Sequence, residues 1–581
     1  MRSAFLFLIL FGSASAQPVR PIDVVQRVAD KLIRETSFEF ALTIQKRNSL
    51  LHSIDWDGFS GSELGAIYYA TSTLTVANDT AVTLGVSHAG PFALFVNGGR
   101  VYSNGSSTED VRETAYEMFR FPSVLPVKLS AGMNTVLIKT LRTSKDRSVM
   151  LGFIDSAGFL KEPVPFSIRP YMKMKNDSIE RSWLLIGPFT QMKSSDLFKE
   201  QFPPETGFKA LYQFSDRTFI WEVPKERTEL SAVISNEASF KQHSYFEWHY
   251  ANGQTALAMI ALGDAAKDAT YTRFVSRYCT VTTEMDKYFS RQFHSGRNRN
   301  GFNYRLYRLS MLDDSSAPVL PFIELALRDS LKNVRPLIDS IARFVSLGQA
   351  RLKDGTLCRM EPEPNTVWAD DLFMSVPFLL RYAKLSGNKA YNDDAVRQIK
   401  NFHSHLYNKE SGICSHGWFD DRSMKSPIAW GRANGWMIWA VSEALLYLPK
   451  DHQGYKEVME IYRQRIKGIM KYQNAGGMWY QILDDPSSYE ETSCSAMFVL
   501  SIARGMTNGW LEKKYRSSAE RGWEGIQQRI AEDGTVGGIC QGTGIGDSKE
   551  FYMKRKTPKH DPRGLGAVIT AGIEMQNMLS Q

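Results

Sequence analysis

The stretch that decides the fold covers residues 354–380 and reads DGTLCRMEPEPNTVWADDLFMSVPFLL. It begins with a glycine turn, Asp354-Gly355-Thr356, and leads to the carboxylate pair Asp370-Asp371, which stands directly before an apolar run. Glycine accepts the left-handed backbone of a tight turn, and aspartate is common where a helix begins. The stretch therefore predicts a turn followed by the polar start of a buried helix.

The same pattern recurs through the second half of the chain. Glycine turns are separated by 54, 57, 65 and 57 residues and stand at Gly301, Gly355, Gly412, Gly477 and Gly534. Polar helix starts alternate with them, at Tyr250-Ala251-Asn252-Gly253, Asp313-Asp314, Asp370-Asp371, Asn434-Gly435, Thr492-Ser493 and Arg563-Gly564. A repeat of about 60 residues that holds one inner helix, one outer helix and a turn indicates a ring of helix pairs.

The helix count closes the ring. Six inner helices need six outer partners, and only five fit between them. Residues 20–45 supply the sixth, because the apolar side chains there fall at helical spacing. The sequence thus predicts an (α/α)6 toroid, or barrel, built from a first helix at 17–52 and the helices at 236–581. The inner helices begin at one end of the ring, so their polar residues should converge on one cleft whose N–H groups favour anions.

Residues 53–235 have a different character, with short alternating apolar runs at 81–86, 92–96 and 134–139 that Gly, Asn and Pro interrupt. Such runs predict an antiparallel β-sandwich inserted after the first helix. Asn97-Gly98-Gly99 predicts a hairpin turn, because Asn and Gly tolerate positive φ.

Composition and the N-terminus limit the partners. The 581 residues are 43% hydrophobic and 23% charged, which excludes a disordered chain, and a net charge of +8 allows anionic partners. Residues 1–16 predict a signal peptide, with Arg2, an apolar run and Ala14-Ser15-Ala16. We expect export to the periplasm or medium, no nucleic acid partner and no membrane insertion.

The five cysteines lie far apart, and we expect them to be mostly buried free thiols.

The candidate catalytic groups are carboxylates. Asp371 is expected to cap its helix, while Asp370, beside the Trp368 indole, is expected to have a raised pKa and to donate a proton. Asp313-Asp314 stands at the preceding inner-helix start, and paired carboxylates suit acid–base work on glycosidic or enol-ether bonds.

Other polar and aromatic residues share the expected face. Rings can stack on sugars and arginine can pair with a carboxylate. These residues are Arg359, His416, Trp430, Arg432 and Asn434. No His or Cys partner stands at metal-ligand spacing and no nucleotide loop is present, so we predict no metal and no cofactor.

Together these motifs resemble the unsaturated uronyl hydrolases of glycoside hydrolase family 105, related to family 88. The resemblance runs from about residue 236 to the end and rests on WHYANG at 248–253, LDD at 312–314, WADDLFMSVPF at 368–378, HGW at 416–418, WGRANGW at 430–436 and ETS at 491–493. It implies an (α/α)6 barrel in which Asp370 is the catalytic acid and Asp314 the second carboxylate, with Asp313 as the alternative register. It also implies a substrate pocket lined by Arg359, His416, Trp430, Arg432, Asn434, Trp368 and Met374.

The resemblance further implies a reaction. The substrate would be an acidic oligosaccharide from a polysaccharide lyase, rhamnogalacturonan- or ulvan-like, whose non-reducing-end uronic acid has a C4=C5 double bond. Asp370 would protonate C4 and water would add at C5. The alternatives are a conventional glycosidase or lyase on the same barrel, or a catalytically silent glycan-binding protein. The β-sandwich resembles, loosely, galactose-binding jelly rolls, and we expect it to brace the barrel or extend its groove.

Overall fold

The computed structural model describes two compact units, one from residues 1–41 and 232–581 and one from residues 42–231. The described residues are 19–47, 51–54, 56, 63–114, 118–143, 149–161, 165–167, 181–189, 214–224, 227–236, 245, 247–287, 289–290, 293 and 303–581. The predicted signal peptide and the predicted turn at Gly301 lie outside them.

Six helices form the inner layer of the first unit. They are α2 (Tyr250–Ala266), α6 (Leu320–Leu327), α8 (Asp371–Ser386), α10 (Gly431–Tyr447), α12 (Thr492–Thr507) and α15 (Pro562–Leu579). Each packs against the next in this order, and α15 packs against α2, so the inner layer closes into a ring. All six begin at or near the predicted polar starts.

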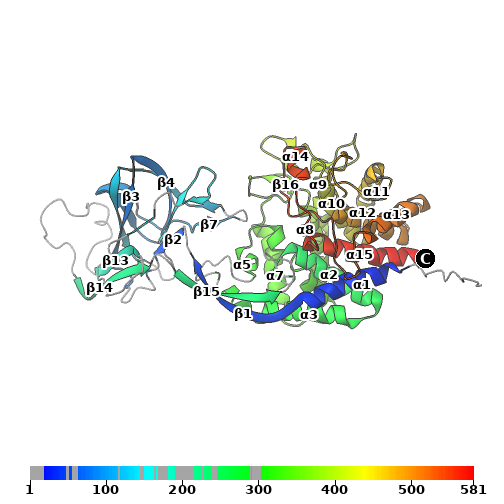
Figure 1. Ribbon diagram of the computed structural model, residues 1–581, viewed down its shortest axis with the longest axis horizontal. Coiled ribbons are helices and arrows are strands. Elements are labelled where there is room, and N and C mark those ends of the chain that lie inside the picture. The colour runs from blue at the N-terminus through cyan, green and yellow to red at the C-terminus, as the bar shows by residue number, and fades with distance from the viewer. Residues whose placement is uncertain are drawn as a thin grey trace, which may run out of the picture. The chain divides into compact units, whose positions relative to one another are not determined.

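Six more helices form the outer layer, each packed mainly against one inner helix. They are α1 (Pro21–Glu35), α3 (Ala269–Glu284), α7 (Arg335–Arg343), α9 (Ala390–Leu406), α11 (Tyr455–Ile469) and α13 (Arg516–Gln527). Figure 1 shows α1, in blue, lying along α15, in red, although the two are far apart in the chain. The first helix therefore supplies the outer partner that the helix count required.

The glycine turns precede the inner helices. Gly355, Gly412, Gly477 and Gly534 have φ angles of 85, 82, 86 and 90°. A β-carbon at Gly534 would lie 2.1 Å from the carbonyl oxygen of Arg27 in α1, so this turn needs glycine for both backbone angle and space.

Short elements connect these helices. They are α5 (Tyr304–Arg308), η2 (Leu312–Asp314), η3 (Phe344–Gly348), β16 (Thr366–Trp368), β17 (Gly417–Phe419), β18 (Met424–Lys425), η4 (Met470–Tyr472), η5 (Lys513–Tyr515) and α14 (Lys549–Met553).

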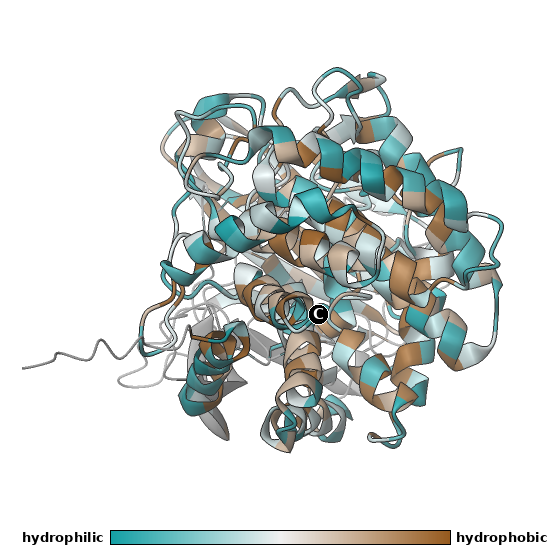
Figure 2. Cartoon of the chain, turned by 90° about the vertical axis from the view of Figure 1, so that its right-hand side faces the viewer, coloured by the Kyte–Doolittle hydropathy of each residue, from teal (hydrophilic) through white to brown (hydrophobic). Residues whose placement is uncertain are grey.

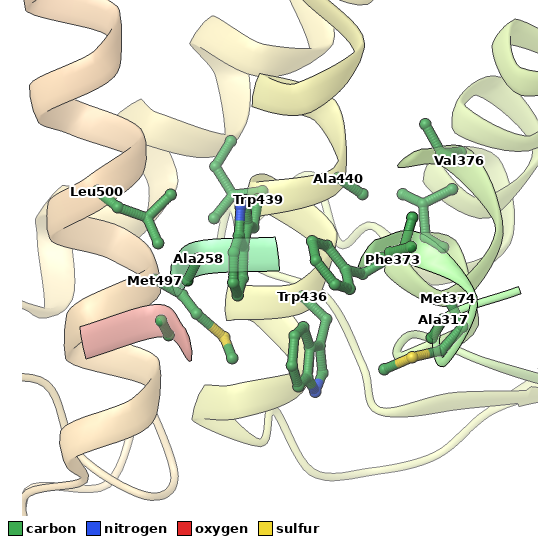
Figure 3. Packing of buried hydrophobic residues seen from close by; sticks show 14 of the residues in the cluster. Ala258, Ala317, Phe373, Met374, Val376, Trp436, Trp439, Ala440, Met497 and Leu500 are labelled. Carbon is green, nitrogen blue, oxygen red and sulfur yellow. The ribbon is translucent and has the colours of Figure 1, made fainter. Parts of the chain in front are cut away.

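The centre of the ring is filled. Figure 2 shows the hydrophobic residues of the helical unit turned mainly inward and the hydrophilic residues outward. Close up, Trp436 and Trp439 of α10 stack with their ring centroids 5.7 Å apart, and the ring of Phe373 in α8 lies 4.3 Å from that of Trp439 (Figure 3). The middle of the ring is thus a packed core and not an open channel.

The first helix is shorter than predicted. It ends at Glu35, and Thr36–Arg47 forms strand β1, which pairs with β15 (Arg227–Asn236). The sequence beyond Thr36 alternates between apolar and polar residues, TSFEFALTIQKR, and period-two alternation favours a strand. The predicted helix over residues 20–45 was wrong in its second half for this reason.

The second unit is built from two antiparallel sheets. One has the strand order β14-β13-β3-β10-β5-β6, and the other has the order β12-β11-β4-β9, with β2 paired to β11. The strands are β2 (Leu51–Ile54), β3 (Ile67–Val76), β4 (Thr80–Ser87), β5 (Phe92–Val96), β6 (Gly99–Asn104), β9 (Ser123–Leu129), β10 (Gly132–Leu141), β11 (Val149–Ile154), β12 (Leu160–Lys161), β13 (Arg181–Phe189) and β14 (Phe214–Pro224), beside a small pair, β7 (Arg112–Glu113) and β8 (Phe119–Arg120). Apolar residues of both sheets share one core, including Leu84 and Val86 of β4 and Leu94 of β5.

Two smaller expectations concern turns and cysteines. The hairpin at Asn97-Gly98 is confirmed, with φ angles of 50 and 79° between β5 and β6. All five cysteines are free and buried, also as expected. None of the helices in the described ranges is long and apolar enough to span a membrane.

Candidate active site

Strand pairing brings together two candidate residues that are distant in the sequence. Trp368 of β16 pairs with Gly417 of β17, and the Ala369 N–H donates to the carbonyl of His416 over 3.0 Å. Asp370 is the next residue, immediately before α8. Nε2 of His416 consequently lies 3.2 Å from Oδ2 of Asp370, although the pair is outside good hydrogen-bond alignment.

His416 is completely enclosed. Its ring packs against Trp430, with centroids 4.6 Å apart, and meets Trp368 edge-on at 5.6 Å. Its Nδ1 lies 2.8 Å from the hydroxyl of Tyr552, while 14% of the Asp370 side chain remains exposed. His416 is thus a fixed, buried partner of a carboxylate that reaches solvent.

The charge state of Asp370 differs from the sequence expectation. Burial raises the pKa of this carboxyl, but the contact with His416 and the charges of Arg359 and Arg432 outweigh burial, so its pKa lies below the ordinary value. The expected raised pKa was wrong, because the Trp368 indole is accompanied by these cationic and hydrogen-bonding neighbours.

Arg359 joins the carboxylates. Its Nε and Nη2 donate to the two oxygens of Asp371 over 2.9 and 2.6 Å, and Nη2 also lies 3.2 Å from Oδ1 of Asp313. The guanidinium stacks on Trp368, 4.3 Å from the ring centroid. Asp371 therefore holds Arg359 in place, and no side-chain cap hydrogen bond is formed at the start of α8. The expected capping role of Asp371 was wrong.

The two candidates for the second carboxylate, Asp313 and Asp314, have different surroundings. Asp314 is buried and bound by Arg308 through Nε, at 2.9 Å, and through Nη2, with Ser310 adding a 3.2 Å hydrogen bond. The side chain of Asp313 is 22% exposed and faces Arg359 instead. Of the two candidates, Asp313 is therefore the one whose side chain is partly exposed and contacts Arg359, and the choice of second carboxylate stays a prediction.

Asp313 also differs from Asp370 in charge. Burial raises the pKa of Asp313 to about 7, with the neighbouring carboxylates of Asp371, Asp370 and Asp314 adding to the rise and Arg359 opposing it. The site thus contains one carboxyl that is ionised at mildly acidic pH and one that keeps its proton until about neutrality.

Three predicted pocket residues turn out to be committed to the protein itself. Arg432 donates to the backbone carbonyls of Cys540 and, over 2.7 Å, of Gln541. Asn434 uses its amide on the backbone of Cys414 and Trp430. Met374 is 1% exposed and packs in the helical core, as Figure 3 shows. These contacts are within the protein, and the expected place of the three residues in the substrate pocket stays a prediction.

The structure adds residues that the sequence did not single out. Tyr250, the first residue of α2, has a pKa raised by burial, and charges from four residues act on its hydroxyl: Arg563, Arg432, Asp313 and Asp370. Arg563, in the first turn of α15, pairs with Asp561 through Nη1 but has no hydrogen-bond partner for Nε among the described residues. Both stand at predicted inner-helix starts, which was the signal that could have found them. Tyr552 stands at no such start, and no sequence signal marked it.

No metal centre emerges from the described part of the chain, which contains no group of three or more His, Cys, Asp or Glu residues arranged to hold an ion. What the residues can do is exchange protons beside buried aromatic rings and cationic groups.

Known proteins were compared with the chain. The family model described as Glycosyl Hydrolase Family 88 matches residues 228–579. An unsaturated rhamnogalacturonyl hydrolase of Bacillus subtilis (strain 168) is 29% identical over 209 residues, which cover 36% of this chain and 59% of that relative. An unsaturated 3S-rhamnoglycuronyl hydrolase of Alteromonas sp. (strain LOR) is 27% identical over 214 residues, covering 36% and 50%. The chain thus matches little more than half the length of these relatives.

A solved structure shares the helical fold. The family 105 glycoside hydrolase of C. acetobutylicum ATCC 824 superposes with a TM-score of 0.50 at 22% identity, over 57% of this chain and 94% of that one. At this identity the likeness bears on fold alone.

Proposed function

Because the chain belongs to glycosyl hydrolase family 88, we propose that it removes the unsaturated uronic acid from the non-reducing end of acidic oligosaccharides made by polysaccharide lyases. The named relatives act on unsaturated rhamnogalacturonyl and rhamnoglycuronyl substrates, which supports a rhamnogalacturonan- or ulvan-like substrate. The observation that carries the proposal is the contact of Asp370 with His416 at the end of the ring where the inner helices begin.

The reaction requires acid–base chemistry and no enzyme nucleophile. A proton added to C4 of the unsaturated sugar leaves oxocarbenium character at C5. Water adds at C5 and loses a proton, and the resulting hemiketal opens with loss of the neighbouring sugar. In this mechanism Asp370 delivers the proton to C4 and then receives the proton from water.

The number of protons that the site holds agrees with this mechanism when Asp370 and Asp313 are treated as a pair. With one pKa below the ordinary value and the other at about 7, the pair holds a single proton at mildly acidic pH. We propose that this proton is the one transferred. An anionic substrate adds negative charge to the site, which raises the pKa of Asp370 and favours the proton on that residue.

Arg563 is the group we propose for the uronate carboxylate. Arg359 and Arg432 already donate to protein oxygens, whereas the side chain of Arg563 is 15% exposed and its Nε has no partner among the described residues. We further propose that residues 53–235 form a jelly-roll-like β-sandwich domain, and that residues 1–16 direct export.

The test is a lyase digest followed by the ultraviolet absorbance of the conjugated double bond. The wild-type protein should abolish this absorbance, and Asp370→Asn should slow its loss by about 10²–10⁴-fold. Asp421→Asn is the matched control, because Asp421 is 57% exposed and, within the described ranges, pairs with its neighbour Arg422. A rise in absorbance would indicate a lyase, sugar release at constant absorbance an ordinary glycosidase, and binding without turnover a glycan-binding protein, and each contradicts the proposal.

A further inference from the structure

We propose that Tyr552 is a positioning residue that keeps the proton of His416 on Nε2, the ring nitrogen that lies 3.2 Å from Oδ2 of Asp370. The inference deepens the proposed function and rests on it for its kinetic consequences. It arises from a chain of three side chains, Tyr552, His416 and Asp370, that come from separate parts of the sequence.

The first step is the hydroxyl of Tyr552. Tyr552 lies on α14, is fully buried, and receives a hydrogen bond from the Gly546 N–H over 3.0 Å. Its own proton has two acceptors within reach, Nδ1 of His416 at 2.8 Å and the carbonyl of Gly546 at 3.5 Å. The shorter contact is the stronger hydrogen bond, so the hydroxyl donates to Nδ1.

The second step is the tautomer of His416. A neutral imidazole carries one proton, and a nitrogen that accepts a hydrogen bond cannot also carry it. With Nδ1 accepting from Tyr552, the proton is on Nε2, which lies 3.2 Å from Oδ2 of Asp370. The Trp368 and Trp430 rings restrict rotation of the imidazole, so Tyr552 selects which nitrogen bears the proton.

The third step is the effect on Asp370. The contact with His416 stabilises the ionised carboxylate, and this contact depends on a donor at Nε2. Without the hydroxyl of Tyr552, the proton can move to Nδ1, leaving a lone pair of Nε2 opposite the carboxylate. The ionised form of Asp370 then loses stabilisation.

Several other ionisable groups act on Asp370 and Tyr552, and any change in pH dependence must be separated from them. They are Arg359, Asp371, Asp313, Arg432, Tyr250 and Asp547. None of them is altered by a Tyr552→Phe substitution, which removes one oxygen and keeps the ring.

The experiment compares Tyr552→Phe with Tyr462→Phe in the full chain. Tyr462 is also fully buried, and its hydroxyl donates to the carbonyl of Ser501 over 2.6 Å, away from the site. In Tyr552→Phe we expect kcat/KM on a lyase digest to fall about tenfold and its acidic limb to move to higher pH. Tyr462→Phe should lower thermal stability without moving that limb.

A second measurement decides the inference without substrate. ¹⁵N nuclear magnetic resonance of the histidine ring, assigned with His416→Gln, should show neutral His416 protonated at Nε2 in the wild type and partly at Nδ1 in Tyr552→Phe. Protonation at Nδ1 in the wild type, or an unchanged ring in Tyr552→Phe, would overturn the inference. If the tautomer is as expected but no digest is turned over, the proposed function fails and the positioning by Tyr552 stands.

Discussion

Asp370 and Asp313 are both largely buried, with 14% and 22% of their side chains exposed, yet their environments move their pKa values in opposite directions. Asp370 touches His416, whereas Asp313 shares the cation Arg359 with Asp371, which binds it through both oxygens. One arginine cannot fully compensate two carboxylates in a poorly solvated place, so the second retains its proton more strongly. The difference follows from how many donors each carboxylate receives.

This difference predicts a pH dependence. If the proton shared by the pair is required, kcat/KM should fall as pH rises through about 7, because Asp313 then loses its proton. Asp313→Asn cannot titrate, so we expect a slower enzyme whose profile lacks this basic limb. The measurement is kcat/KM on a lyase digest between about pH 4 and 9.

The stability of Asp313→Asn should be measured at the same time. Arg359 keeps its bidentate pair with Asp371, so the variant should remain folded. A basic limb near pH 7 that persists in the folded variant would assign the limb to another group and remove Asp313 from the mechanism.

At the scale of elements, the glycine turns set the spacing between helix layers. Gly477 has a φ of 86°, and a β-carbon there would lie 2.3 Å from the carbonyl oxygen of Arg521 in α13. Gly387, which follows α8, has a φ of 74°, but no atom lies within 4 Å of the place where its β-carbon would be. The first glycine is required by packing and conformation, the second by conformation alone.

Alanine substitutions separate the two requirements. Gly387→Ala should cost about 1–2 kcal/mol of unfolding free energy through backbone strain. Gly477→Ala adds a clash with main-chain atoms that cannot move without α13, and we expect about 2–5 kcal/mol in total. Denaturant unfolding of both variants is the measurement, and equal losses would show that the approach to Arg521 is unimportant.

The sequence predicted elements better than contacts. The start of α8 at Asp371 followed from a local pattern, as did the turns at Gly355 and Gly477. The contact of His416 with Tyr552 joins residues 136 positions apart and could not be predicted, because it depends on how the segment before α15 folds over the ring. Asp313 and Asp314 are adjacent, and only the position of Arg308 separates their roles.

At the scale of the helical unit, a network of buried ion pairs links five inner helices. Arg381 of α8 contacts Glu324 of α6 and Glu443 of α10, each over 3.0 Å. Arg504 of α12 contacts Glu443 over 2.8 Å and Glu574 of α15 over 2.7 Å. Successive members are 57, 62, 61 and 70 residues apart, close to the repeat itself. Equivalent positions of five repeats thus alternate between glutamate and arginine. This alternation is a pattern in the sequence that the spacing of the glycine turns does not reveal.

Glu443 is central to this network, since it alone pairs with both arginines. Burial alone would raise its pKa, but Arg504 and Arg381 outweigh burial and lower it. Glu443→Gln removes the charge and keeps the shape, leaving each buried arginine with less compensation. We expect a loss of about 3 kcal/mol of unfolding free energy near neutral pH, measured by denaturant unfolding. Glu512→Gln, at an exposed pair with Lys514, should cause no measurable change.

The pH dependence of this loss identifies its origin. A carboxyl with a lowered folded pKa contributes stability above its unfolded pKa, about 4.3 for glutamate, and loses that contribution as pH falls through the folded value. The gap between wild type and Glu443→Gln should therefore be widest near neutrality and narrow steadily in acid. A gap that stays constant to acidic pH would mean that Glu443 acts through packing and not through its charge. In the expected case, the charges that alternate around the ring help hold the inner helices in the arrangement that brings Asp313, Asp370 and His416 together.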